Sequence, residues 1–479
     1  MAKLTVHALL LLPFLLPLVL AAPDPNPQAE ITTTSTTLTT SSSPSTPSPT
    51  PSIICNNSPD LCTRAYNNIT HLGAHDSPFV RDPSTRNSVA GNQYYNATVA
   101  LSAGVRLLQA QVHFSNPSSS SSSSASGEGG GDGGVLRLCH TDCRLMDAGR
   151  LEDWLGTIRV WLEGNGNEVV TLLLVNSDDR GRGVFGEAFE RAGLGRYGFV
   201  PGSTSNSTTS NSSGSNSSGS NSSGSNSTGP IAWPTLQTLI TANTRLVVFI
   251  ASLPAVSSSA QETADSQTYP YLLNEFDHVF ETAYNITDPS AFNCALDRPA
   301  NTTFSSSSTS GTDNKEGTLA QQALSAGRLP LLNHFVYLQL TPDIWIPSAS
   351  GVNATNSPSE ADSDVGALGR HIKTCRQEWN SSSSKPVFVL VDFYNHGPAI
   401  EAVDRANGIV GVGRVKEPVP SSSSSSGEQW NQNQAWAIIL ASVLSAVSLA
   451  MVWYIFRNSR CWVCWGCCGQ NHPEGYYRN

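Results

Sequence analysis

Two histidines and two aspartates in this chain are placed where they could perform acid/base chemistry. His75 and Asp76 come directly after an apolar run that breaks at a glycine, His140 follows a short apolar run, and Asp392 closes a late one. An imidazole with a pKa near 6.5 can accept or donate a proton around neutral pH, and a carboxylate can fix its tautomer. The four side chains could therefore form two acid/base pairs. In-line attack on a phosphodiester needs such an arrangement, because one group removes a proton and another supplies one.

Short apolar runs that alternate with helix-like patterns predict the elements that position these residues. Runs that are apolar on both faces are typical of parallel strands covered by helices. The predicted strands are 69–73, 105–112, 169–176, 246–251, 331–337 and 387–392. A helix with one core-facing stripe is predicted from the spacing of Leu151, Trp154, Leu155, Ile158, Trp161 and Leu162. About 300 residues of this kind fit one (β/α) barrel, whose functional sites form at the carboxyl ends of the strands.

The run Gly73-Ala74-His75-Asp76-Ser77 and the chain order His-Asp, His, Asp resemble the phosphatidylinositol-specific phospholipase C X-domain superfamily, in its fungal secreted or membrane-anchored form. The resemblance covers roughly residues 53–415 and implies an α/β fold of the TIM (β/α) barrel type. It also implies that His75 is the general base that deprotonates an inositol 2-hydroxyl, with Asp392 orienting its imidazole. His140 would be the general acid that protonates the leaving diacylglycerol oxygen, with Asp76 as its carboxylate partner.

The chain departs from the family at the positions that handle the phosphate charge. Metal-independent bacterial members have an arginine where Gln111 falls, and calcium-dependent members have carboxylates at positions matching Gln109 and Gln111. Glutamine replaces neither a cation nor a hard-metal ligand. Asn176 stands about where the calcium type has an acidic ligand. We therefore assign Gln109, Gln111 and Asn176 to substrate binding and predict no cofactor. Calcium stays open, because Asp178 and Asp179 are close by in the sequence.

Other basic and titratable residues are predicted to lie away from the site. Arg106 is an odd number of residues from Gln109 and Gln111, so strand alternation puts it on the opposite face. His71 and His334 are expected to be structural or peripheral, as is His113.

Two apolar segments predict export and membrane anchoring. The N-terminal run is short, contains prolines and ends in small residues, which predicts a cleaved signal peptide, 1–22. Segment 435–456 has 22 residues without a charge, enough to cross a bilayer core as a helix. Arg457 and Arg460 follow it, so the positive-inside bias places the C-terminus in the cytosol and the main domain outside or in the lumen. The membrane would be the plasma membrane or one of the secretory pathway. A glycosylphosphatidylinositol-anchor signal is the alternative, although the polar extension after the span argues against it.

Composition divides the rest of the chain. Polar Ser-, Gly- and Asn-rich repeats bury no apolar surface, so they predict disordered inserts and linkers. The predicted organisation is a signal peptide (1–22), a Ser/Thr/Pro-rich stalk (23–52), a barrel domain (53–419) with inserts at 117–134, 202–229 and 305–317, a linker (420–434), a transmembrane helix (435–456) and a Cys-rich cytosolic tail (457–479).

The cysteines, the sequons and the charge agree with an exported domain. Six cysteines precede the predicted span, and we predict the local disulfides Cys55–Cys62 and Cys139–Cys143. The four tail cysteines favour palmitoylation over unmodified thiols or zinc binding. Outside the repeats, N-glycosylation sequons occur at Asn56, Asn68, Asn96, Asn285, Asn301, Asn353 and Asn380. The net charge of −10 offers no basic patch, so nucleic acid is not an expected partner.

Two classes of function remain from the sequence. In the first, the protein is a phosphoric diester hydrolase of the phosphatidylinositol phospholipase C type, acting on a phosphoinositide, a glycosylphosphatidylinositol or a related glycerophosphodiester. In the second, the barrel is catalytically weak or inactive and serves as a glycosylated cell-surface interaction protein. Loss of one electrostatic stabiliser typically lowers the rate about a hundredfold to a thousandfold, which keeps the second class open. The complete set of two histidines and two aspartates favours the enzyme. The expected partners are then a phospholipid or phosphodiester substrate and a membrane, and the sequence does not predict the oligomeric state.

Overall fold

The computed structural model describes residues 53–115, 134–202, 231–300, 302, 304, 317–341, 344–380, 385–415 and six positions between 447 and 454. The predicted signal peptide, stalk, linker and tail, and almost all of the three predicted inserts, lie outside these described residues. So does most of the predicted transmembrane segment 435–456. Among the described residues, no helix is long and apolar enough to cross a membrane.

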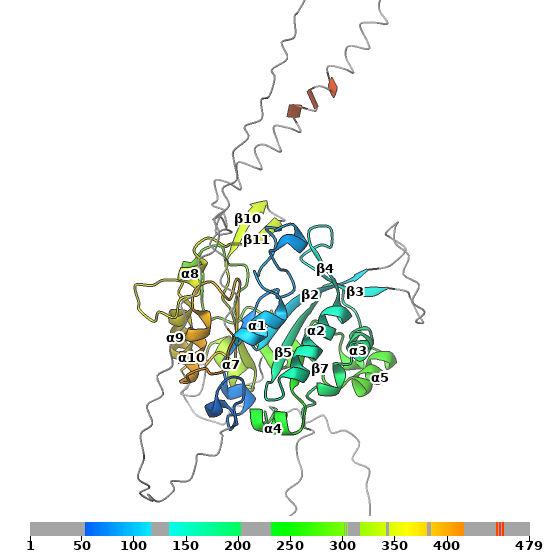
Figure 1. Cartoon of the computed structure of the whole chain (residues 1–479), viewed down its shortest axis with the longest axis vertical. Helices are drawn as coiled ribbons and strands as arrows, with labels where there is room; N and C mark the ends of the chain where they lie inside the picture. Colours follow the sequence, from blue (N-terminus) through cyan, green and yellow to red (C-terminus); the bar gives the residue numbers. More distant parts are fainter. Residues whose placement is uncertain are drawn as a thin grey trace, which may run out of the picture. The chain divides into compact units, whose positions relative to one another are not determined.

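Eight strands form a curled sheet in which every pairing is parallel (Figure 1). The order is β7-β6-β5-β2-β1-β12-β9-β8, so strands that are consecutive in this set are neighbours in the sheet, except for β7 and β8 at its two ends. Their bounds are β1 His71–Ala74, β2 Leu107–Ser115, β5 Val170–Asn176, β6 Leu246–Ala251, β7 Leu272–Asn274, β8 Val279–Glu281, β9 Leu329–Asn333 and β12 Phe388–Val391. Within the described residues no backbone ladder joins β7 to β8. The α/β class and the parallel sheet are as predicted, but the barrel is open at this seam.

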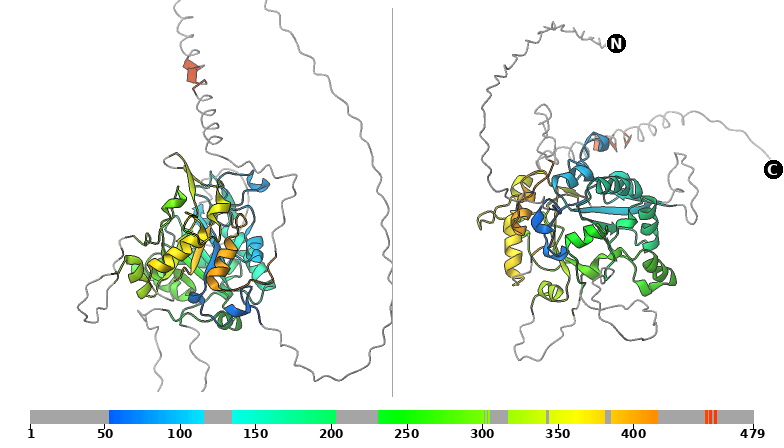
Figure 2. Two further views of the ribbon diagram at one scale, coloured as in Figure 1. Left: turned by 90° about the vertical axis from the view of Figure 1, so that its left-hand side faces the viewer. Right: turned by 60° about the horizontal axis from the view of Figure 1, so that its bottom comes forward.

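Most of the helices lie on the outside of the sheet, whereas α4 packs with Leu236 and Leu239 against the cluster inside the barrel (Figures 1 and 2). They are α1 Ala97–Ala103, α2 Leu151–Gly164, α3 Arg182–Arg191, α4 Leu236–Thr241, α5 Ala260–Thr268, α6 Glu275–His278, α7 Leu319–Ser325, α8 Val352–Thr355, α9 Leu368–Glu378 and α10 Ala399–Asn407. The predicted stripe of α2 is confirmed. Its leucines and isoleucine are fully buried, and Trp154 and Trp161 pack against the same core while partly exposed.

Alternate residues of the barrel strands pack into two different cores. In β12, Phe388 and Leu390 belong to the cluster inside the barrel, whereas Val389 and Val391 belong to the cluster under the helices. This explains why the strands read as continuous apolar runs, since neither face meets water.

Two antiparallel hairpins extend the barrel and were not predicted. β3 (Val135–Cys139) pairs with the end of β2 and with β4 (Asp147–Arg150). β10 (Tyr337–Thr341) pairs with β11 (Ile344–Pro347). The predicted strand 331–337 is therefore two elements, because the barrel strand ends at Asn333 and Tyr337 begins the hairpin.

Three disulfides fasten the domain. The two predicted local bonds, Cys55–Cys62 and Cys139–Cys143, are present, and the third joins Cys294 to Cys375 on α9.

The sequon at Asn56 does not suit a glycan in the folded domain. Asn56 is buried, and its side-chain amide donates to Val169 O (3.2 Å) while its oxygen accepts from Val169 N (2.7 Å). A sugar on this nitrogen would have to fit into a buried position of the fold, so this sequon is not evidence of glycosylation in the folded state.

Close packing around β1 yields a stability prediction. A Cβ on Gly73 would lie 2.7 Å from Leu390 Cδ2 and 2.8 Å from Leu107 Cδ2, both inside the barrel. We expect Gly73→Ala to lower the free energy of unfolding by about 1–3 kcal/mol through overpacking. Urea denaturation measures the change. Gly156→Ala on α2 is the matched control, since a Cβ there meets nothing within 4 Å. In a helix it should raise stability by roughly 0.5–1 kcal/mol. A Gly73→Ala protein as stable as the wild type would contradict this packing.

Candidate active site

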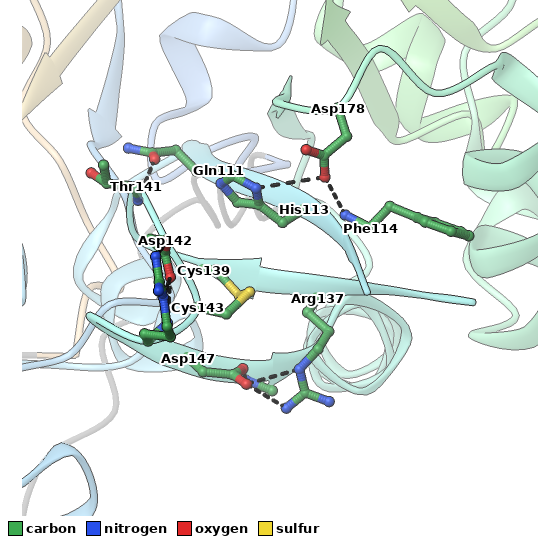
Figure 3. The surroundings of a disulfide bond; sticks show 12 residues. Gln111, His113, Phe114, Arg137, Cys139, Thr141, Asp142, Cys143, Asp147 and Asp178 are labelled. Atoms are coloured by element: carbon green, nitrogen blue, oxygen red, sulfur yellow. Dashed lines mark hydrogen bonds and ion pairs between the residues drawn. A yellow bond between two sulfur atoms is a disulfide. The ribbon is translucent and has the colours of Figure 1, made fainter. Parts of the chain in front are cut away.

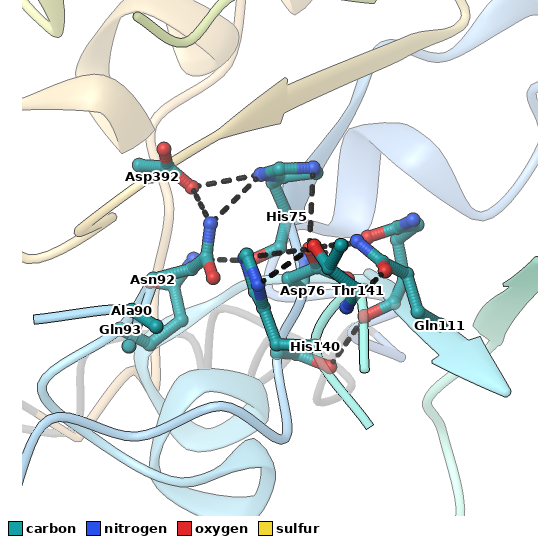
Figure 4. A network of polar contacts seen from close by, with 12 residues as sticks. His75, Asp76, Ala90, Asn92, Gln93, Gln111, His140, Thr141 and Asp392 are labelled. Carbon is teal, nitrogen blue, oxygen red and sulfur yellow. Dashed lines mark hydrogen bonds and ion pairs between the residues drawn. The ribbon is translucent and has the colours of Figure 1, made fainter. Parts of the chain in front are cut away.

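The turn after β1 presents the first two catalytic candidates at the carboxyl end of the barrel (Figure 4). The N–H of His75 donates to Val391 O (3.0 Å), which extends the pairing of β1 with β12. Asp76 then adopts a left-handed conformation with φ of 47°, and its N–H donates to Gln109 Oε1 (2.6 Å). This sharp turn brings both side chains over the end of the sheet.

His75 is fixed by Asp392 and by two amides. Its Nδ1 donates to Asp392 Oδ1 over 2.8 Å, since a carboxylate can only accept. Asn92 Nδ2 donates to the same oxygen (3.0 Å), and Gln93 Nε2 donates to His75 O (2.8 Å). Phe335 stacks on the imidazole at a centroid distance of 3.7 Å. With Nδ1 carrying a proton, the remaining nitrogen, Nε2, is the one available for proton transfer.

Asp76 lies between the two histidines. Its Oδ2 is 3.6 Å from His75 Nε2 and 3.7 Å from His140 Nε2, and it accepts a hydrogen bond from Gln111 Nε2 (2.8 Å). The carboxylate is 0% exposed, and its Oδ1 has no hydrogen-bond partner among the described residues. The two predicted acid/base pairs therefore share one buried carboxylate.

His140 reaches the site from the β2–β3 extension. The Cys139–Cys143 disulfide closes the turn that follows β3, and Thr141 in this turn has a φ of 62° (Figure 3). Thr141 N donates to Gln111 Oε1 (2.9 Å), and His140 N donates to Met146 O (3.0 Å). His140 Nε2 is buried and has no hydrogen-bond partner in the part of the chain that the structure describes.

The three residues assigned to substrate binding differ in their hydrogen bonds and in whether they line the cavity near His75. Gln109 supports the turn at Asp76, and Gln111 bridges Asp76 to Thr141, so both amides already position the catalytic candidates while lining the cavity described below. Asn176 instead bonds to Arg180 and Ser252 in the loops after β5 and β6 and does not line that cavity.

The donor set does not fit a calcium ion. Calcium takes six to eight oxygen ligands. The positions that carry carboxylates in the calcium-dependent type are Gln109 and Gln111, and their amides are occupied. Asp178, which the sequence left as a possible recruit, accepts from Phe114 N (2.5 Å) and lies 3.6 Å from His113 (Figure 3). We therefore derive no step through a metal.

A cavity of about 200 Å³ opens beside His75. It is lined by His75, Gln109, Gln111, Leu173, Val175, Glu275, Glu281, Tyr284, Arg298, Asn333, Phe335, Tyr337 and Leu390. A larger cavity, of about 650 Å³, lies at the amino ends of β9 and β12 and contains none of the four catalytic candidates. The smaller cavity is therefore the one relevant to their chemistry.

One wall of the smaller cavity is a charged cluster that the sequence analysis missed. Arg298 forms an ion pair with Glu281, which also accepts from Asn333 Nδ2 (3.0 Å). The guanidinium lies over the ring of Tyr284, 4.3 Å from its centroid, and its Nε has no hydrogen-bond partner within the described ranges. Arg298 is the one Arg or Lys among the residues that line this cavity. No motif marks the segment between β8 and α7, and only the fold brings it to the site.

Burial and charge set the protonation of the site. Burial acts to lower the pKa of His75, but Asp76 and Asp392 outweigh it and raise the pKa above 6.5. Burial lowers the pKa of His140, with Asp76 opposing it only in part. Burial raises the pKa of Asp76 against the effect of both imidazoles. In the wall cluster, burial raises the pKa of Glu275 well above its usual value, so Glu275 is protonated next to ionised Glu281. With no ligand bound, His75 holds a proton more strongly than His140. This is the reverse of the order that the predicted base and acid roles need.

Comparison with known proteins identifies close sequence relatives. The PI-PLC X 1 family model matches residues 61–209, 224–309 and 317–407. "PI-PLC X domain-containing protein 1" of Arthroderma benhamiae is 31% identical over 358 residues, which cover 74% of this chain and 90% of that protein. An "uncharacterized secreted protein" of the same organism is 29% identical over 346 residues, 72% of this chain and 60% of that protein.

Solved structures also match over most of this chain. The phosphatidylinositol-specific phospholipase C from Listeria monocytogenes aligns over 72% of this chain and 94% of that one, with 12% identity and a TM-score of 0.38. A mutant of the enzyme from Staphylococcus aureus aligns over 72% and 94%, with 12% identity and a TM-score of 0.33.

The pairing of His75 with Asp392 predicts a pH-dependent stability. Because the pKa of His75 is raised on folding, its protonation adds stability that is fully present below about pH 6.5 and is lost as the pH rises through the folded-state pKa. Asp392→Asn removes one of the three charges that raise the pKa of His75, those of Asp76, Asp392 and Glu281, so this pKa should fall and this part of the stability should shrink. Imidazole NMR titration and urea unfolding at several pH values measure both effects. Asp178→Asn is the control, since it removes a carboxylate beside His113 instead. An unchanged His75 titration in Asp392→Asn would contradict the assignment.

Proposed function

Because the chain belongs to the PI-PLC X domain family, we propose that it is a phosphoric diester hydrolase in which His75 and His140 act as base and acid. The observation that carries the proposal is the shared carboxylate. Both imidazoles approach Asp76 Oδ2 at the carboxyl end of the barrel, beside a cavity that can hold a head group. We place the reaction outside the cytosol, supported by the three disulfides and by the relative named a secreted protein.

The reaction starts at His75, because His75 lines the cavity and His140 does not. A head-group hydroxyl next to the phosphate gives its proton to His75 Nε2, and the hydroxyl oxygen attacks phosphorus. The bond from phosphorus to the glycerol oxygen breaks, and His140 donates a proton to that oxygen. The products are a cyclic phosphodiester of the head group and diacylglycerol.

Substrate binding must move the proton for this reaction to begin. In the ligand-free site the pKa values place it on His75. An anionic phosphate beside His140 raises the pKa of that imidazole, since an opposite charge favours the protonated form. Asp76 contacts both rings and so can stabilise the proton on either one.

Arg298 supplies the positive charge that is missing at Gln111. It faces the same cavity as His75, has an unpartnered Nε, and is held by Glu281 and Tyr284. With Glu275 protonated, the cluster of Glu281 and Arg298 is close to neutral. In this cluster Arg298 can pair with one phosphodiester charge, and the carboxyl groups can bind hydroxyls of the head group. The cavity lining offers no further cation for a polyphosphorylated head group. Phosphatidylinositol and glycosylphosphatidylinositol are therefore the favoured substrates.

Hydrolysis in the presence of a chelator tests the catalytic pairs. The purified protein should release diacylglycerol from phosphatidylinositol without added metal, and His75→Ala and His140→Ala should each lower the rate by at least about a hundredfold. His278→Ala, on α6, is the control and should retain activity. If the folded wild-type protein shows no turnover on phosphatidylinositol or on a glycosylphosphatidylinositol-anchored protein, the surface-interaction function takes precedence.

A separate substitution tests the cation. Arg298→Gln should lower kcat by about a hundredfold to a thousandfold, because one electrostatic stabiliser of the transition state is lost. Added guanidinium ion should restore part of the rate. Arg196→Gln is the matched control, because Arg196 also pairs with a glutamate, Glu163, and lies over a tyrosine ring, Tyr197, but away from the cavity. Equal rates for Arg298→Gln and the wild type would show that another group carries this charge.

A further inference from the structure

Two histidines and two cysteines form a buried cluster outside the catalytic site, which we call the His/Cys cluster: Cys294, His334, His371 and Cys375. All four are at most 6% exposed. His334 directly follows β9, and Cys294 lies on the segment between β8 and α7. His371 and Cys375 are four residues apart on α9 and so share one face of the helix. Phe292 stacks on both imidazoles.

The two imidazoles of this cluster make three polar contacts, but two neutral imidazoles carry only two ring protons. His334 Nε2 lies 2.9 Å from Thr355 O, and His371 Nε2 lies 3.1 Å from Asn293 O. Carbonyl oxygens only accept, so each Nε2 must carry a proton. The two Nδ1 atoms are 3.0 Å apart and then have only lone pairs to offer each other. Two neutral imidazoles have two ring protons for three contacts, so the third contact needs one added positive charge between the Nδ1 atoms, from a proton or a metal ion.

A metal ion suits this arrangement. Histidines that bind a metal through one nitrogen typically donate the other N–H to a backbone carbonyl or a carboxylate, as both rings do here. Two nitrogens on a tetrahedral zinc ion, each at about 2.0–2.1 Å, would be roughly 3.4 Å apart, close to the spacing observed.

The two sulfurs of the cluster lie close to one of the two imidazoles, that of His371. Coordinating atoms of Cys294, His371 and Cys375 lie within 4.8 Å of one another. In the structure the sulfurs are joined as a disulfide, a form in which they are poor ligands. Two thiolates and two imidazoles are the donors of a structural zinc site.

We propose that the reduced form of the His/Cys cluster is a Cys₂His₂ binding site for Zn²⁺, which the Cys294–Cys375 disulfide replaces in the oxidised form. A dithiol reductant supplies two electrons and two protons, the S–S bond breaks, two thiols form, and the reductant becomes a disulfide. Zinc binding then releases the two thiol protons. Either state ties α9 to the segment that continues to Arg298, and His334 is flanked by Asn333 and Phe335 of the catalytic cavity wall. The proposal does not depend on the hydrolase activity.

The test measures zinc and cobalt binding to the full-length protein in detergent. The four tail cysteines (Cys461, Cys464, Cys467 and Cys468) are replaced by serine so that they cannot bind the metal. A phosphine reductant opens the disulfides and becomes a phosphine oxide. We expect one Zn²⁺ per reduced chain, a melting temperature that rises with zinc concentration, and the absorption of tetrahedral thiolate-bound Co²⁺. The oxidised protein should show none of these.

Matched variants locate the site. His334→Asn and His371→Asn retain both cysteines, so their folding is checked in the oxidised form before reduction. Each should weaken zinc binding and change the cobalt spectrum, whereas His278→Asn should bind like the parent. Zinc that leaves the melting temperature of the reduced protein unchanged would overturn the proposal, as would a reduced chain that stays unfolded with excess zinc. Equal zinc binding by the two cluster variants and the parent would also overturn it, since the metal would then be held elsewhere.

Discussion

The burial of the Asp76 carboxylate is the constraint on which the site depends. A charge removed from water is costly unless hydrogen bonds and opposite charges surround it. Here the partners are Gln111 and two imidazoles, and each comes from a different part of the fold. The strand order meets this need, because β1 lies between β2, which carries Gln111, and β12, which leads to Asp392. Without this neighbourhood the two histidines would be far apart.

The same electrostatic logic explains why two glutamines are compatible with a catalytic site. At Gln111, an arginine would place a fixed positive charge against Asp76 and change the protonation of both histidines. The neutral amide instead holds Asp76 and the His140 turn in place. The positive charge is found across the cavity at Arg298, where Glu281 balances it. In the proposed mechanism, positioning and charge stabilisation are thus assigned to different residues.

The sequence predicted those parts of the molecule that depend on local pattern. Strands β5 and β6 and the stripe of α2 were recognised because they are long and continuously apolar or periodic. Strands β7 and β8 have three residues each, too few for a pattern, and each pairs with one neighbouring strand at an end of the sheet. The predicted strand 331–337 was too long because apolar residues continue from β9 into the hairpin that follows it.

In the candidate site, too, local sequence pattern predicted some residues, whereas others depend on the three-dimensional arrangement. His75, Asp76 and Asp392 sit at strand ends, where the barrel fold itself makes them candidates. Asn92 and Arg298 come from irregular segments, and their roles follow only from three-dimensional contacts. Asn176 was placed by analogy with the calcium type, but its amide is used to close loops.

The identity of the first product tests the central claim most directly. If His75 activates a hydroxyl of the head group, ³¹P NMR of phosphatidylinositol with the wild-type protein and a chelator should show a five-membered cyclic phosphodiester before any phosphomonoester. The signal should be absent with His75→Ala. Direct appearance of a phosphomonoester would mean that water, and not the head group, is the nucleophile. That result would contradict the paired acid/base account.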